Sequence, residues 1–214
     1  MSGFEVADQT GEGTRELDRL IFFSDAVFAI VMTLLSLDIQ VPNIPANLVS
    51  AELPSRVVDL WPKFFSYVLS FMVIGTYWIA HHGTFRYIMS YDRRLLWLNL
   101  LFLLSISFVP FPTSLLGEYG DQQFAVVLYA ASLAIPRLLL AVIWWYALKG
   151  PILISERLNP KMARYHLGRS LTIPLLFLLS ILISFFSVSA AIFSWFLMFG
   201  VDAVLWRFVG ASHP

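Results

Sequence analysis

The chain has 214 residues, enough for about one domain, and only 13% of them are charged, against roughly 25% in soluble domains. Hydrophobic residues make up 58%, with 19 Phe, 8 Tyr and 7 Trp, which is more apolar surface than a soluble domain of 24.3 kDa can bury. The net charge is zero and Cys is absent, so no basic field for nucleic acid, thiolate metal site or Cys nucleophile is expected. This composition excludes an ordinary soluble domain and predicts a protein embedded in a lipid bilayer.

Six stretches of the sequence are long and apolar enough to cross a bilayer, which takes about 20 residues. The expected helices are 19–41, 62–85, 93–116, 122–148, 168–187 and 190–208. The last two come from the charge-free run 170–201, which is too long for one span and should turn near Ser187–Ser189. Three prolines in 42–61 argue against a continuous helix in that loop. The predicted fold class is therefore an all-α polytopic membrane protein.

The distribution of Lys and Arg predicts the orientation of these spans. Six spans place both termini on one side, where eleven basic residues fall, against Arg56 and Lys63 alone on the other side. Both termini are therefore expected in the cytoplasm, with the protein in the cell membrane. The predicted organisation is an acidic polar tail (1–18), a transmembrane domain (19–209) and a short C-terminal tail (210–214), and the acids of the first segment argue against a signal peptide.

The first predicted span has two different faces. At about 100° per residue, one face carries an apolar stripe. Its members are Phe23, Ile30, Leu34 and Leu37. Thr33 lies beside the stripe, and Asp25 lies on the far side of the helix. Such a stripe is typical of lipid contact or helix packing, and it also suits a pore, in which rings of Ile or Leu exclude water and a hydroxyl offers a ligand to a cation.

Asp25 needs a partner or a function, because a carboxylate inside a span is costly. Several polar side chains are expected at a similar depth: His81, His82, Asn99, Arg137 and Asp202. A buried hydrogen-bond network among them would hold the first helix against the second and third, and a proton relay is the alternative use of such groups. Arg137 could pair with Asp25 or Asp202. Adjacent His81 and His82 point about 100° apart on a helix, so no metal site is predicted, nor any other cofactor.

The same residues could serve two classes of protein other than a channel, a transporter and a hydrolase. A proton-coupled secondary transporter would use Asp25, the His81/His82 pair and Arg137, but the sequence shows no inverted repeat and no matched pair of broken spans. A hydrolase could be drawn from Ser24, Asp25 and His81, but a nucleophile elbow and a metal motif are both missing from the sequence. No enzymatic activity is therefore predicted.

Four sequence strings carry a family resemblance. Residues 19–25 fit R-x-x-x-F-S-D in the first span, Tyr-Trp-Ile-Ala-His-His (77–82) follows in the second, and Leu-Asn-Leu (98–100) with Phe-Val-Pro-Phe-Pro-Thr (108–113) follows in the third. Together they resemble the transmembrane protein 175 family of potassium channels, in its short prokaryotic form. The resemblance implies a homotetramer of six-helix subunits whose first helix lines a central pore. It also implies a pore without a carbonyl selectivity filter, and the sequence holds no T-V-G-Y-G string.

The resemblance also implies roles for individual residues. Ile30 would form the narrowest ring, Leu34 and Leu37 would form further hydrophobic rings, and the Thr33 hydroxyl would contribute to potassium preference. A structural network would hold the first helix and would comprise Arg19, Phe23, Ser24, Asp25, His81 or His82, and Asn99. The expected function is a potassium-permeable cation channel, whose partners are potassium ions, further copies of the chain and the lipid bilayer.

Overall fold

The computed structural model describes residues 3–150, 160–197 and 200, and the secondary-structure elements among them are helices, with no strand. The helices are α1 (Gly3–Leu34), the 3₁₀ helix η1 (Leu35–Asp38), α2 (Val49–Val58), α3 (Trp61–Phe85), α4 (Arg93–Phe108), α5 (Pro110–Tyr119), α6 (Gln123–Lys149), α7 (Pro160–Ser184) and α8 (Val188–Ser194). The all-α prediction is confirmed for this part of the chain.

Four described helical segments are long and apolar enough to span a membrane, and they coincide with the first four predicted spans. These segments are Glu16–Asp38, Trp61–Phe85, Arg93–Tyr119 and Gln123–Lys149. The protein is thus a multi-pass helical membrane protein. The fifth predicted span corresponds to α7, and the sixth, 190–208, lies largely outside the described residues.

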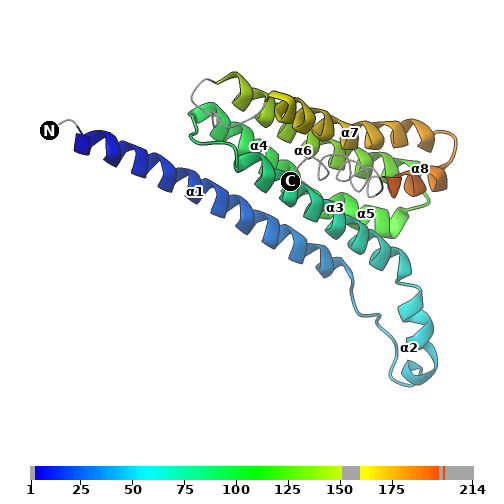
Figure 1. The fold of residues 1–214 in the computed structure, drawn as a ribbon. Helices are drawn as coiled ribbons and strands as arrows, with labels where there is room; N and C mark the ends of the chain where they lie inside the picture. The colour runs from blue at the N-terminus through cyan, green and yellow to red at the C-terminus, as the bar shows by residue number, and fades with distance from the viewer. Residues whose placement is uncertain (1–2, 151–159, 198–199, 201–214) are drawn as a thin grey trace, which may run out of the picture.

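The helices form a bundle with α6 at its centre and α1 at its flank. Figure 1 shows α1 running along one side of the bundle, next to α3 and α4, while α7 and α8 lie on the other side and α2 stands off one end. In their most hydrophobic windows, 61% of the residues of α6 are buried but only 22% of those of α1. Because α1 has neighbours on one side only, a large part of its surface is open.

Proline explains where the structure departs from the predicted helix boundaries. The predicted span 93–116 divides at Val109, because Pro110 has no N–H to donate to Ile106, whose carbonyl instead accepts the N–H of Val109 at 3.1 Å. The segment 42–61 is not one continuous helix, as predicted, but it does contain the ten-residue helix α2, which tolerates Pro54 in its interior. The prediction that no continuous helix covers the segment was therefore correct, but it missed the short helix in the second half.

Two further boundaries also differ from the prediction. The helix of the first span begins at Gly3, so the described part of the acidic segment 1–18 is a continuation of α1. The turn predicted near Ser187–Ser189 lies at residues 185–187, directly after α7. Ser187 caps α8 there by accepting a hydrogen bond from the N–H of Ala190 at 3.2 Å, and Trp195 then donates its indole N–H to Ser180 at 2.8 Å, which closes the α7–α8 hairpin.

Candidate functional site

The structure separates the two faces of α1 that the helical periodicity predicts. Phe28, Val31 and Leu35 are 1–2% exposed and pack against α3 and α4, with Ser24 buried on the same side. On the other side, Ile30 is 58% exposed, Leu34 43% and Leu37 68%. The predicted stripe is therefore uncovered in the single chain, while the opposite face holds α1 on the bundle.

A buried hydrogen-bond chain connects α1, α4 and α3. The side-chain amide of Asn99 donates to Ser24 Oγ at 3.0 Å, and its Oδ1 lies 2.9 Å from His81 Nε2. Because an amide oxygen only accepts, His81 carries its hydrogen on Nε2. Ser24 in turn donates to the carbonyl of Leu20 at 2.9 Å. All three side chains are completely buried, and their mutual hydrogen bonds tie the three helices together, although His81 Nδ1 has no hydrogen-bond partner among the described residues.

Aromatic rings determine the position of the imidazole in this chain. His81 stacks on Phe85 with ring centroids 4.3 Å apart and on Phe102 at 5.2 Å, and Phe28 of α1 approaches the same ring at 5.8 Å. Both stacked rings are themselves buried. This apolar cage leaves the imidazole one orientation, with Nε2 toward Asn99.

The other residues predicted for the network lie elsewhere. Asp25 accepts a hydrogen bond at 2.8 Å from the indole N–H of Trp78 on α3. His82 is exposed, with its ring 6.1 Å from that of Trp78, and Arg19 and Phe23 are also exposed. The structure thus brings Ser24, His81 and Asn99 together and gives Asp25 a separate partner.

Arg137, a member of the alternative proton relay, is buried in the centre of the bundle. Its guanidinium carbon lies 5.6 Å from the centroid of the Tyr77 ring, a cation–π arrangement. The hydroxyl of Tyr77 donates to the carbonyl of Leu133 at 2.7 Å, in the turn of α6 that precedes Pro136. Asp202, one of the two proposed partners of Arg137, lies outside the described residues.

Three contacts that hold α1 could not be found by sequence reasoning. Trp78 binds Asp25, as described above, and the only signal for it was its place one turn before His81 on the same helix. At the start of the span Glu16–Asp38, Tyr91 donates to Glu16 at 2.7 Å, and this hydrogen bond raises the pKa of Tyr91. At the other end, Ser114 of α5 donates to Asp38 of η1 at 2.7 Å. The first span is therefore anchored at both ends and in its middle.

Thr33 presents its oxygen on the open side of α1. Its hydroxyl donates to the carbonyl of Ile30 at 2.8 Å, and the side chain is exposed. With the hydrogen directed to the backbone, the lone pairs of the oxygen are available to an external cation. No three His, Cys, Asp or Glu side chains in the described part of the chain are placed to hold a metal ion.

Comparison with known proteins shows consistent similarity. Residues 19–110 match the family described as the endosomal/lysosomal potassium channel TMEM175. A potassium channel of Streptomyces collinus is 37% identical over 155 residues, covering 70% of this chain and 73% of that protein. A potassium channel of Chamaesiphon minutus is 32% identical over 181 residues, covering 81% of this chain and 86% of that protein.

A solved structure is similar to this chain over almost all of its length. The crystal structure of a lysosomal potassium-selective channel TMEM175 homolog from Chamaesiphon minutus has a TM-score of 0.76 and 28% identity, and the similarity covers 94% of this chain and 100% of that chain. The apolar spans define a polytopic membrane protein. The matched family and relatives place it in the class of ion channels, which are not enzymes. The chain belongs to the TMEM175 family.

Proposed function

We propose that the chain forms a potassium-permeable cation channel, a homotetramer in the plasma membrane whose four α1 helices line a central pore. The observation that supports this most is the open face of α1, since Ile30, Leu34 and Leu37 are exposed while the opposite face is anchored to α3 and α4. The named relatives favour a channel over the proton-coupled transporter, because those proteins are potassium channels.

Small residues on one flank of the open face support contact between α1 helices. Ala26, Ala29, Thr33 and Ser36 are all exposed and recur at intervals of three or four residues. Small side chains allow helices to approach closely within a membrane. The flank can therefore pack against the α1 helix of a neighbouring copy, while Ile30, Leu34 and Leu37 face the pore axis.

In this pore the constriction is hydrophobic. Ile30 forms the narrowest ring, and Leu34 and Leu37 form further rings that exclude water when closed. A cation crosses the Ile30 ring only after losing part of its hydration shell, which potassium loses more readily than sodium. Thr33, whose oxygen faces the open side, supplies a ligand beside the ring. Selectivity should therefore be modest, since no carbonyl filter replaces the whole hydration shell.

The charges at the two ends of the bundle support cytoplasmic termini. The end at which Tyr91 contacts Glu16 carries Arg86, Arg93, Arg94 and Lys149. Among the described residues of the opposite end, Arg56 and Lys63 are both paired with carboxylates. An excess of Lys and Arg marks the cytoplasmic side.

The test is the reversal potential of the purified protein in a planar bilayer, with potassium on one side and sodium on the other. Discrete current steps with a reversal displaced toward the potassium equilibrium potential are expected. Ile30→Ala should raise the single-channel conductance several-fold and move the reversal potential toward zero. Thr33→Val, which keeps the shape of the side chain and removes its hydroxyl, should change the reversal potential while the current persists.

Ile135→Ala on α6 is the matched control, because Ile135 is 49% exposed and lies on α6, whereas α1 packs on α3 and α4. It should leave conductance and reversal unchanged. Equal currents in wild type and Ile30→Ala would show that Ile30 does not form the constriction. A substrate flux that follows a proton gradient without current steps would instead favour the transporter.

A further inference from the structure

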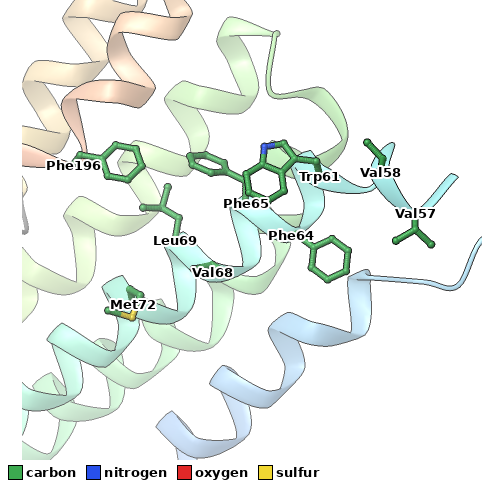
Figure 2. A pocket seen from close by; sticks show the side chains of 9 residues that line it. All are labelled: Val57, Val58, Trp61, Phe64, Phe65, Val68, Leu69, Met72 and Phe196. Atoms are coloured by element: carbon green, nitrogen blue, oxygen red, sulfur yellow. The ribbon is translucent and has the colours of Figure 1, made fainter. Parts of the chain in front are cut away.

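An apolar groove lies at the end of the bundle from which α2 projects, and its lining residues belong to elements other than α1. Its volume is about 850 Å³, within the range of roughly 300–1,000 Å³ for small-ligand sites. Figure 2 shows its lining, which comes from the end of α2, the first turns of α3 and Phe196, two residues after α8. The lining residues are Val57, Val58, Trp61, Phe64, Phe65, Val68, Leu69, Met72 and Phe196.

The groove runs along the bilayer normal for about the depth of one leaflet. Trp61 and Met72 are eleven residues apart on α3, which at 1.5 Å per residue is about 17 Å, close to half of the ~30 Å hydrocarbon core. Trp61 is 69% exposed at the start of the span, where indole favours the membrane–water interface. The groove therefore begins at the interface and ends near the midplane.

The interior of the groove offers hydrocarbon contacts. The rings of Phe65 and Phe196 lie 6.2 Å apart and join α3 to the end of α8, and Val68 and Met72 are both about half exposed. Every lining side chain is apolar apart from the indole N–H of Trp61. A polar ligand would lose its hydration there without compensation.

Charges at the mouth indicate which head group fits. Arg56 binds Glu52 at 3.1 Å, Lys63 binds Glu118 at 2.7 Å, and Asp59 lies between them in the sequence. Both described cations at this mouth thus have a carboxylate partner, and the local balance is slightly acidic. An anionic head group would be repelled, whereas a zwitterionic one can offer its ammonium to a carboxylate.

From this depth, lining and charge we propose that the groove binds an acyl chain of a zwitterionic phospholipid from the leaflet at the α2 end of the bundle. The bound chain would contact α2, α3 and Phe196 together. This site is separate from the proposed ion pathway, so it stands whether or not α1 lines a pore.

The experiment uses the full-length protein in vesicles of phosphatidylcholine that contain a trace of phosphatidylcholine with a diazirine on its acyl chain. After illumination, mass spectrometry locates the attached lipid. Labelling is expected to concentrate on residues 57–72 and to fall several-fold in Val68→Trp, which fills the groove. Val142→Trp on α6 is the matched control, because Val142 is 42% exposed and outside the groove, and it should keep the wild-type labelling.

Anionic competitors and a cysteine probe complete the test. Unlabelled phosphatidylcholine should compete for the site several-fold better than phosphatidylglycerol, and the reverse order would overturn the assignment of the head group. Labelling spread evenly over exposed apolar positions, and equal in Val68→Trp, would overturn the site. The native chain has no Cys, so Val68→Cys is a clean probe. Disulfide-linked dimers of that variant would show that a second copy covers the groove and would also overturn the proposal.

Discussion

Three buried side chains decide how the first helix is held. Asn99 of α4 uses both ends of its side-chain amide, one toward Ser24 of α1 and one toward His81 of α3. Of these three residues, it is the one that links both other helices. Neither partner has access to water, since both are completely buried. Loss of this amide would therefore leave two buried polar groups without their described hydrogen bond.

Asn99→Leu should destabilise the protein by about 1–3 kcal/mol, the usual cost of leaving buried polar groups unsatisfied. Thermal unfolding of the detergent-solubilised protein, followed by size-exclusion chromatography after heating, measures this. Ser107→Ala on the same helix is the control, because the Ser107 hydroxyl is exposed and bonds only to the carbonyl of Leu104. If both variants melted with the wild type, the network would have no structural role.

Asp92 combines a charge with a helix cap. It accepts a hydrogen bond from the N–H of Leu95 at 2.8 Å and another from the Tyr146 hydroxyl. Partial burial alone would raise its pKa, but the hydrogen bonds from Tyr146, Leu95 and Arg94 outweigh burial and hold the pKa below its ordinary value of 3.8. The ionised carboxylate is thus the form that stabilises the fold.

Because the pKa of Asp92 is lower in the folded state, its contribution to stability is complete above about pH 4 and is lost as the pH falls through the folded pKa. Asp92→Asn should keep the helix cap. Its melting temperature should fall less than that of the wild type when the pH is lowered from 6 to 3. Asp92→Ala removes the cap as well and should cost about 1 kcal/mol at neutral pH. An unchanged acid slope in Asp92→Asn would show that other carboxylates carry the effect.

At the scale of the elements, α3 and α5 approach each other closely at one glycine. A Cβ atom on Gly117 would lie 2.8 Å from Ser66 Oγ and 3.2 Å from Lys63 Cα, and the second contact is with backbone that cannot rotate away. The approach also brings Lys63 to Glu118 and Ser114 to Asp38. The end of α1 is therefore coupled to the α3–α5 contact.

Gly117→Ala should force α3 and α5 apart and lower the melting temperature, with a cost of about 1–3 kcal/mol for overpacking. Gly83→Ala on α3 is the matched control, since nothing lies within 4 Å of its added Cβ. That control should be neutral or slightly stabilising, because Ala is the better helix former. Equal melting of the two variants would contradict the close approach.

At the scale of the whole molecule, the open face of α1 predicts assembly. Native mass spectrometry should give a particle of four chains of 24.3 kDa each, and a monomer would contradict the proposed pore. In a Cys-free chain, Leu37→Cys should form disulfide-linked dimers under mild oxidation, because four copies place this position around one axis. Val142→Cys on α6 should stay monomeric on a denaturing gel.

Much of the fold follows from local sequence properties. A run of about 20 apolar residues has to satisfy its backbone internally within a bilayer, so spans such as 62–85 and 122–148 were predictable to within one residue of α3 and α6. The grouping of Ile30, Leu34 and Leu37 on one face follows from the helical period alone, and in the structure these three side chains are exposed together.

Tertiary structure alone decided which polar groups meet. The depth of a residue along a span can be estimated from its number, but the rotation of one helix against another cannot. The sequence therefore left open whether His81 or His82 joins the network. The packing of α3 decides for His81, which contacts Phe102 and Asn99. The pairing of Asp25 with Trp78 depends on the same rotation. Hydrophobicity and period act within one helix and are visible in the sequence, whereas hydrogen bonds between helices depend on packing over long sequence separations.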